Sequence, residues 1–248
     1  MRCQPRLLSA RNEEVGDRLR DKVGEPLTDE VFYKAPGGKV LNRLARKARL
    51  GIFDVFVDRI RPAETDTILD VGVSVVEDNP EESNILEQMH PYSHRVTMLG
   101  IHDGSFLEKR FPGTRYRRYD PRGNFPFSDG EFDVCYCNAV LEHVGLAEDR
   151  RRFLREVLRV GRKVFLTTPN RWFPLEMHKR IPFLHWLPQA WYRAILRTTG
   201  DNFYSRPENL NLLSRNELDR LFRELDVPFT ILPYRFMGFI SNWVVVAK

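Results

Sequence analysis

The strongest fold signal in the chain is the stretch Thr67-Ile-Leu-Asp70-Val-Gly72-Val-Ser74, a short apolar run that ends in Asp-x-Gly. Such a run predicts a buried strand that breaks into a tight loop. In an open α/β sheet, ligands bind outside the carboxyl ends of strands of this kind. The corner at Asp70–Gly72 is therefore the first candidate for a ligand site.

A second stretch, residues 125–144, has the same organisation and reads FPFSDGEFDVCYCNAVLEHV. It combines a turn, an apolar strand, a polar segment and the start of a helix. The strand is expected over Phe132–Cys137, and it delivers Asn138 and Ala139 to the edge of the sheet.

Together the two stretches resemble the class I methyltransferases that use S-adenosylmethionine, in the type 11-like branch whose strands read LDvG and lPFpdgsFDvv…vlEHv. The resemblance covers roughly residues 65–170 and, more loosely, the C-terminal strands. The glycine loop of the family, G-x-G-x-G, is here Gly72-Val73-Ser74, with one glycine retained. S-adenosylmethionine has no pyrophosphate, so it needs fewer loop glycines than a dinucleotide does.

This resemblance implies an α/β fold with a Rossmann-like, seven-stranded sheet in which one strand is antiparallel. It also implies S-adenosylmethionine as the cofactor and S-adenosylhomocysteine as the product. The final strands are expected at Phe229–Tyr234 and Trp243–Ala247, after a helix that opens with the capping box Ser214-Arg-Asn-Glu217.

Composition limits the class of protein. A chain of 248 residues with 42% hydrophobic residues can bury a full core, and its length suits one domain with elaborations. It contains no run of 18 apolar residues, and its first residues lack a secretory signal pattern. A cytoplasmic location is therefore expected.

Cysteine and charge patterns argue against several other classes. Cys135 and Cys137 lie two apart on a predicted strand, so they share one face and are expected in the core, not in a disulfide or a metal site. The net charge of +5 is dispersed through Arg-rich helices, which favours a solvated surface over a nucleic-acid groove. Asn138 also lacks the Pro-Pro-aromatic sequence of methylases that act on DNA bases, so a nucleic-acid partner is not expected.

The chain is predicted to divide into an N-terminal helical segment, residues 1–62, and a methyltransferase domain, residues 63–248. Helices are expected near Leu7–Lys22 and Lys39–Ile60. The second helix carries an apolar stripe that must pack on another element. Its basic side either is solvated or contacts a membrane or nucleic acid.

The resemblance assigns the cofactor site residue by residue: Asp70, Val71, Gly72 and Val73 at the first corner, Asp120 and Pro121 after the third strand, and Asn138 and Ala139 after the fourth. The second strand ends in His102-Asp103, and either residue is a candidate for the acid that binds the ribose hydroxyls. Each assignment has an alternative. His102 and Asp103 could merely cap a helix that begins near Ser105. Separately, Asp120 could merely form an Asx-turn before Pro121.

His143 is expected in the first turn of the helix after the fourth strand, on the acceptor side. A histidine there is a candidate general base, although Glu142-His143 is also a pair that shapes a loop. A helix over Glu81–Met89 is expected after the first strand, and another over Asp149–Val160.

Residues 171–212 are more than the core fold needs, and they contain three of the four tryptophans. We predict that they form an inserted helical cap after the fifth strand that selects the acceptor. Its candidate polar groups are His178 and His185, both possible catalytic residues, together with Asn202 and Tyr204. Alternatively, the aromatic residues form a satellite core or face a bilayer with help from Lys179, Arg180, Arg193 and Arg197.

Three functions remain open. The favoured one is transfer of a methyl group to a small-molecule or lipid-like acceptor, with peripheral membrane contact as an option. A non-catalytic scaffold with the same fold is the second, because the glycine loop is reduced. A nicotinamide-dependent oxidoreductase is the third, and the missing G-x-G-x-x-G argues against it.

Overall fold

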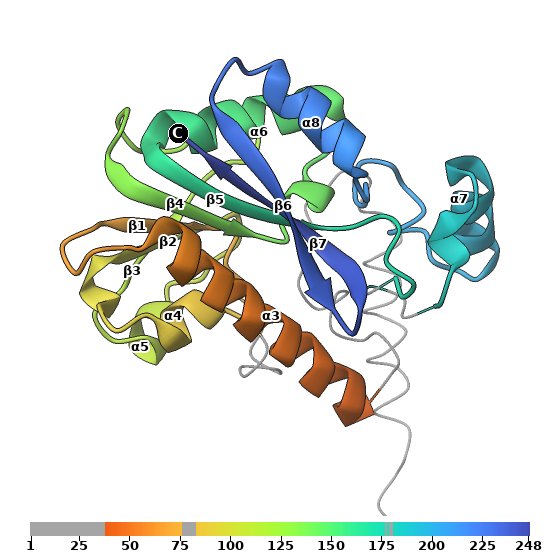
Figure 1. Ribbon diagram of the computed structural model, residues 1–248, viewed down its shortest axis with the longest axis horizontal. Helices are drawn as coiled ribbons and strands as arrows, with labels where there is room; N and C mark the ends of the chain where they lie inside the picture. Colours follow the sequence, from red (N-terminus) through yellow and green to blue (C-terminus); the bar gives the residue numbers. More distant parts are fainter. Residues whose placement is uncertain (1–37, 76–82, 177, 179–180) are drawn as a thin grey trace, which may run out of the picture.

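A computed structural model describes residues 38–75, 83–176, 178 and 181–248. It contains a seven-stranded sheet in the order β3-β2-β1-β4-β5-β7-β6 (Figure 1). The strands are β1 Ile68–Val71, β2 Val96–Gly100, β3 Arg115–Arg118, β4 Phe132–Asn138, β5 Gly161–Pro169, β6 Phe229–Phe236 and β7 Phe239–Ala247. β1 to β5 run parallel, and β7 is antiparallel to both β5 and β6. The predicted sheet with one antiparallel strand is confirmed.

Helices cover both faces of this sheet. On one face lie α3 Gly38–Ile60, α4 Ile85–Met89 and α5 Leu107–Arg110, and on the other lie α6 Ala147–Val160 and α8 Arg215–Arg223 (Figure 1). A further helix, α7 Gln189–Thr198, stands to one side of the sheet with the chain around it. Three short 3₁₀ helices are η1 Ser93–Arg95, η2 Leu141–His143 and η3 Leu184–Trp186.

Strand alternation sorts the core into two layers. Leu69, Cys135 and Cys137 are buried in the layer shared with α6 and α8. Their chain neighbours on the strands, including Ile68, Val134 and Tyr136, are buried in the layer shared with α3. Both cysteines are unbridged, so the prediction that they are small core residues is confirmed.

The helix α3 confirms the prediction of a helix over Lys39–Ile60, and its apolar stripe packs on the sheet. The ring of Phe56 is fully buried and meets the rings of Tyr136 and Phe165 edge to face, at centroid distances of 5.0 and 5.3 Å. The helix expected near Leu7–Lys22 lies outside the described residues.

Helix boundaries differ from prediction at two places. Glu142 and His143 do not open the helix after β4, because they form the separate turn η2. α6 begins only at Ala147, where the backbone N–H of Leu146 donates to Asp149 Oδ2 at 3.0 Å. Within the described residues α4 begins at Ile85, because Asn84 takes a left-handed conformation with φ of 55°. The predicted capping box at Ser214 and Glu217 is confirmed at the start of α8. No helix in the described part of the chain is long and apolar enough to cross a bilayer.

Candidate functional site

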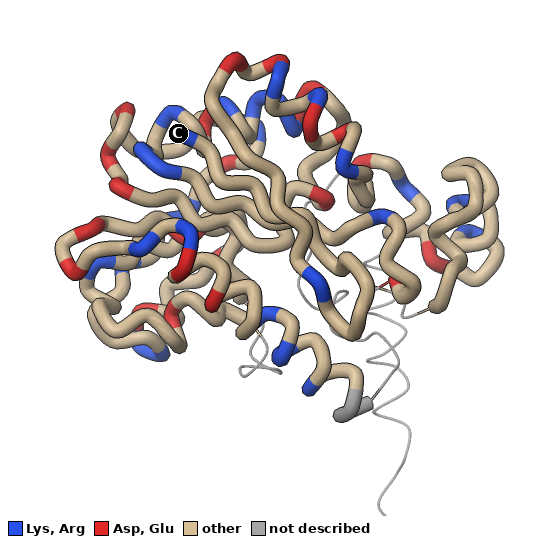
Figure 2. Tube along the Cα trace, viewed as in Figure 1, with Lys and Arg blue, Asp and Glu red and all other residues tan. Residues whose placement is uncertain are grey.

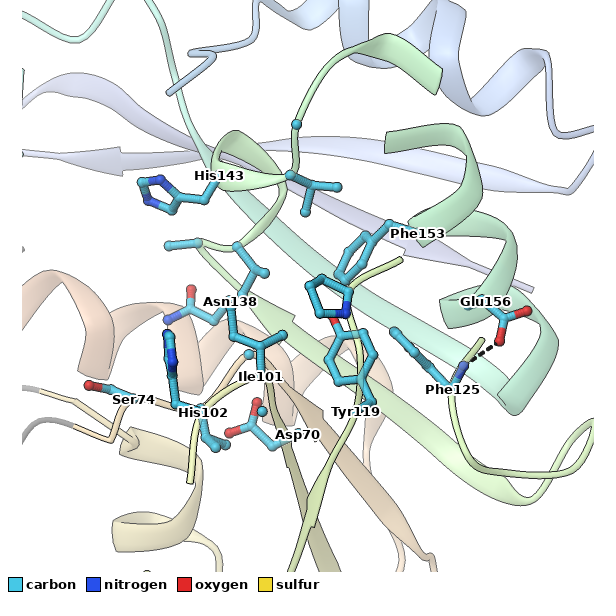
Figure 3. Close-up of a pocket in the computed structure, with 18 of the residues that line it drawn as sticks. Asp70, Ser74, Ile101, His102, Tyr119, Phe125, Asn138, His143, Phe153 and Glu156 are labelled. Carbon is cyan, nitrogen blue, oxygen red and sulfur yellow. Dashed lines mark hydrogen bonds between the residues drawn. The ribbon is translucent and has the colours of Figure 1, made fainter. Parts of the chain in front are cut away.

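A cavity of about 450 Å³ opens at the carboxyl ends of β1, β2 and β4. Figure 3 shows the side chains that line it: Asp70, Ser74 and His102 lie on one side, Tyr119, Phe125 and Phe153 on the other, and Asn138 and His143 lie toward η2. The volume falls within the range of roughly 300–1,000 Å³ that is usual for small-molecule sites. The carboxyl group of Asp70 and the rings of Tyr119, Phe125 and Phe153 therefore lie on opposite sides of one cavity.

The β1 corner is built around Gly72. Its φ is 89°, and a Cβ atom at this position would lie 2.3 Å from Val140 Cγ2 in the loop after β4. Glycine is required here because it accepts positive φ and the close approach of Val140. The one glycine retained in the loop therefore lies at a position where no other residue fits without strain. Of the other predicted corner residues, Val73 lines the cavity, whereas Val71 is buried in the core and does not.

The place of the missing loop glycines is taken by a side-chain contact. Asn84, just before α4, accepts a hydrogen bond from the backbone N–H of Ser74 on Oδ1 and donates from Nδ2 to the Ser74 carbonyl, both at 2.8 Å. The Asn84 side-chain amide thus pairs with both the backbone N–H and the backbone C=O of Ser74, as a neighbouring β-strand does. We refer to this contact as the Asn84 clamp, and it fixes the loop that borders the cavity.

The polar end of the cavity contains buried titratable groups. Asp70 lines the cavity, and Glu87 of α4 interacts with it. Burial, together with the neighbouring Glu87, raises the pKa of Asp70 well above its usual range. Burial likewise raises the pKa of Glu87 to about 7. A cation bound beside Asp70 would offset this effect, because it favours the charged form of a carboxyl group.

The aromatic wall of the cavity was largely missed from sequence. Tyr119 follows β3, Phe125 lies in the Pro-Phe turn, and Phe153 lies on α6. The rings of Tyr119 and Phe125 meet edge to face at 4.9 Å, and those of Phe125 and Phe153 at 5.8 Å. Glu156 fixes the turn, because its Oε2 accepts from the Phe125 backbone N–H at 2.7 Å. The inward position of Phe153 on a helix was the available signal for this wall.

The two candidates at the end of β2 separate in the structure. His102 lines the cavity, whereas Asp103 does not. Asp103 Oδ1 accepts from the backbone N–H of Ser105 at 3.2 Å, and hydrogen bonds from Ser105 lower the pKa of its carboxyl group. Because β2 already ends at Gly100, this hydrogen bond, and not strand alternation, holds the carboxyl group of Asp103 outside the cavity. Asp103 forms a local turn with Ser105 ahead of α5, whose N-cap is Phe106 with no side-chain hydrogen bond.

Asp120 also lies outside the cavity lining, although Pro121 belongs to it. Its Oδ1 accepts from the Arg122 backbone N–H at 2.9 Å, which is the Asx-turn that was the alternative at this position. At the end of β4, Asn138 and Ala139 both line the cavity as predicted. Asn138 Oδ1 accepts from the Thr167 hydroxyl at 2.5 Å, and Ala139 has a φ of 57°.

Of the three histidines predicted as catalytic, only His143 lines the cavity. His143 Nδ1 lies 3.0 Å from the carbonyl oxygen of Asn209, and its Nε2 lies 3.1 Å from His178 Nε2. His178 Nδ1 in turn contacts Glu176 Oε1. His185 is buried elsewhere in the inserted segment, with its Nε2 2.8 Å from the Phe173 carbonyl. His178 and His185 are not part of the cavity lining: His178 lies behind His143, and His185 binds a carbonyl group within the inserted segment.

The row of contacts from the Asn209 carbonyl through His143 to His178 fixes the proton positions on His143. A carbonyl only accepts, so His143 Nδ1 carries a proton toward Asn209. Burial, and then the nearby His178, lower the pKa of His143 to about 3, so the ring is neutral and its Nε2 accepts from His178. His178 Nδ1 in turn is held by Glu176. Both nitrogens of His143 are thus engaged by protein groups, which is the geometry of a positioning residue.

The inserted segment meets the cavity at one edge. Glu208 and Asn209 line the cavity, and the Asn211 backbone N–H donates to the Glu142 carbonyl at 2.7 Å. Most of the segment instead encloses a small core of its own, formed by Tyr192, Leu196, Tyr204, Leu210 and Leu212. The polar residues expected to face the acceptor, Asn202 and Tyr204, are not part of the cavity lining.

Comparison with known proteins agrees with this geometry. Residues 84–164 match the family model described as a methyltransferase domain. Similar solved structures include S-adenosylmethionine-dependent methyltransferases from Methanosarcina mazei and Aquifex aeolicus. The first has 18% identity and a TM-score of 0.50, covering 77% of this chain and 96% of that one. The second has 13% identity and a TM-score of 0.52, covering 84% and 96%. No curated protein matches the sequence.

A third similar structure spans almost the whole chain. It is magnesium protoporphyrin IX methyltransferase from Synechocystis PCC 6803 with bound S-adenosylhomocysteine, with 12% identity and a TM-score of 0.52, covering 97% of each chain. The fold is that of a class I methyltransferase. The match to a methyltransferase domain over residues 84–164 and the shared fold agree with the predicted resemblance, and one of the similar structures holds S-adenosylhomocysteine, the predicted product.

The residues of this cavity fit S-adenosylmethionine. Its positive sulfonium and ammonium groups suit the end that holds Asp70, and its adenine suits the wall of Tyr119, Phe125 and Phe153. The buried hydroxyl of Tyr136, which also lines the cavity, has no hydrogen-bond partner among the described residues. A buried polar group without a partner is costly, so a ligand that pairs with it would be favoured.

Proposed function

We propose that the protein transfers the methyl group of S-adenosylmethionine to a small-molecule or lipid-like acceptor. The observation that carries this proposal is the cavity at the carboxyl ends of β1, β2 and β4, with the buried carboxyl group of Asp70 on one side and aromatic rings on the other. This position is the ligand side of an open α/β sheet.

The bound cofactor supplies a methyl group that is already activated by the positive charge of its sulfur. The protein then acts mainly by binding and orientation. Asp70 holds a positive group, the aromatic wall excludes water from the adenine end, and Asn138 and Ala139 shape the surface between them. The acceptor is expected to enter beside Glu208 and Asn209, where the inserted segment borders the cavity.

Calorimetric titration of the full chain with S-adenosylmethionine, S-adenosylhomocysteine and, as a control ligand, NAD tests this function. We expect saturable binding of the first two and no binding of NAD. Asp70→Ala should weaken S-adenosylhomocysteine binding at least about tenfold, as expected for loss of a hydrogen bond to a charged group worth ~1.5–3 kcal/mol. Asp103→Ala is the matched control, because this carboxylate lies outside the cavity.

A non-catalytic scaffold is the competing function, and it is motivated by the single loop glycine. Gly72 and the Asn84 clamp argue against it, because together they keep the loop in a defined conformation at the cavity. Absence of binding to either sulfur ligand by the folded wild-type chain would favour the scaffold and reject the proposal.

A further inference from the structure

The turn between β6 and β7 exposes apolar side chains under backbone strain. Phe236 pairs with Phe239, so Met237 and Gly238 form a two-residue loop, with φ of 51° and 85°. Loops with two positive φ values favour Asn-Gly, because an ordinary side chain is disfavoured in this conformation. Met237 is nevertheless 68% exposed and Phe239 is 56% exposed. Packing among the described residues does not explain why Met237 and Phe239 occupy the tip.

The inserted segment repeats this feature. Phe183 has a φ of 61°, an unusual value for a bulky residue, and its side chain is 53% exposed. Its ring stands edge to face with that of Trp186, which is 41% exposed, at a centroid distance of 4.8 Å. Trp172 is 52% exposed. Aromatic side chains are thus held outward on an ordered framework.

Hydrogen bonds connect the start of the segment to the hairpin. Asn170 donates from its backbone N–H to the Ser241 carbonyl at 2.8 Å and from Nδ2 to the Ile240 carbonyl at 2.9 Å. Its Oδ1 accepts from the Trp172 backbone N–H at 3.2 Å. Further along the segment, the backbone N–H of Phe183 donates to the Pro174 carbonyl at 2.8 Å, so Phe183 lies close to the start of the segment. We call the exposed side chains of Trp172, Phe183, Trp186, Met237 and Phe239 the aromatic end.

Positive charge accompanies these side chains. Among the described residues of the range 170–200, the cationic side chains are Arg171, Arg193 and Arg197, and the one carboxylate, Glu176, is buried. The hairpin, residues 229–243, contains Arg235 and no acidic residue. Figure 2 shows Lys and Arg, and no Asp or Glu, along the N-terminal half of α3, which runs past the hairpin.

We propose that the aromatic end binds the surface of an anionic phospholipid bilayer. Tryptophan and phenylalanine side chains at the headgroup level contribute apolar burial, and nearby cations are attracted to anionic lipids. A second copy of the chain is the less suitable partner. In a two-fold dimer the same surface meets itself, so the cations of the two copies would face one another. This proposal does not depend on the methyl-transfer activity.

Vesicle flotation of the full chain tests the proposal, with vesicles of phosphatidylcholine alone and of phosphatidylcholine mixed with phosphatidylglycerol. We expect binding to the mixed vesicles and at least about tenfold weaker partitioning for Met237→Asn/Phe239→Ser, since each side chain loses its apolar burial. Arg235→Gln should reduce only the preference for anionic vesicles, by roughly fivefold.

Met237→Asn also separates lipid binding from a structural role. Asparagine suits the positive φ of the turn, so this variant should unfold at a temperature equal to or above that of the wild type while it binds vesicles less. Met89→Asn is the matched control, because Met89 of α4 is 46% exposed and lies away from the aromatic end.

Three results would overturn the proposal: no binding of the wild type to mixed vesicles, equal loss of binding in Met89→Asn, or a concentration-dependent dimer in sedimentation that the double variant abolishes. The last result would assign the surface to a second copy. Titration with S-adenosylhomocysteine on the same samples keeps this test separate from that of the proposed function, because the substituted residues lie outside the cavity.

Discussion

His102 and Asp103 are neighbours in the chain, but only His102 faces the cavity. The resemblance made each of the two residues a candidate ribose ligand. The choice between them depended on where β2 ends. β2 ends at Gly100, yet the two residues still diverge, because Asp103 is held by the backbone N–H of Ser105.

We expect His102→Ala to weaken S-adenosylhomocysteine binding by several-fold to about tenfold, because an imidazole that lines the cavity is lost. Asp103→Asn should leave the affinity within a factor of about two, since its carboxyl group is outside the cavity. Calorimetry on both variants measures this contrast. The reverse pattern would mean that the ribose is bound on the other side of the β2 end.

A second residue-scale expectation concerns Glu87, whose pKa is raised by burial from 4.5 to about 7. The folded state therefore binds this proton more tightly than the unfolded state does. Its contribution to stability is full below pH 4.5 and is lost as the pH rises to about 7. The loss is on the order of 3 kcal/mol for an isolated group.

Glu87→Gln should thus be more stable than the wild type at about pH 8 and lose this advantage at about pH 5, because glutamine is neutral at both pH values. Urea denaturation at the two pH values measures the difference. Glu64→Gln, at an exposed position, is the control. An equal effect of Glu87→Gln at both pH values would contradict the raised pKa.

At the scale of elements, the Asn84 clamp connects the loop after β1 to the start of α4. Two hydrogen bonds of about 1 kcal/mol each hold Ser74 in place. We expect Asn84→Ala to weaken cofactor binding by about tenfold while the sheet stays folded, since the clamp orders only the loop.

Calorimetric titration and the thermal unfolding temperature should be measured together for this variant. Asn202→Ala, an exposed asparagine in the inserted segment, is the matched control. Unchanged affinity in folded Asn84→Ala would show that the loop is held by other contacts.

The elements themselves were predictable from sequence because their signals are local. The apolar strand at Phe132 and the capping box at Ser214 each depend on a few neighbouring residues. The site was less predictable, because it depends on contacts between distant residues. Glu87 meets Asp70 only after α4 packs on the sheet, and Phe153 reaches the cavity only because α6 crosses behind the Pro-Phe turn.

At the scale of the whole molecule, the inserted segment is attached to the sheet through η2. His178 contacts His143, and the Asn209 carbonyl accepts from the other side of the same ring. The segment has its own small core, so this attachment decides how firmly it borders the cavity. Sequence predicted a cap at residues 171–212, but it did not predict that the histidines would bind one another instead of an acceptor.

We expect His178→Ala to loosen the segment without unfolding the sheet, because Glu176 would lose a buried partner. Hydrogen exchange should become faster in residues 184–213 and stay unchanged in β4 and β5. Thr198→Ala, at an exposed position on α7, should change neither. Protection lost equally in the segment and the sheet would instead indicate that the two unfold as one unit.

The clamp also bears on how relatives of this chain are found. A motif search that counts glycines after the first strand passes over this sequence, and the match to the methyltransferase domain begins at Asn84 itself. An asparagine ten positions after the loop residue, as Asn84 is after Ser74, binds only the backbone of that residue and can preserve the loop while its glycines are replaced. Chains that have few loop glycines but an asparagine at this position should be tested as methyl-transfer enzymes before they are classed as inactive.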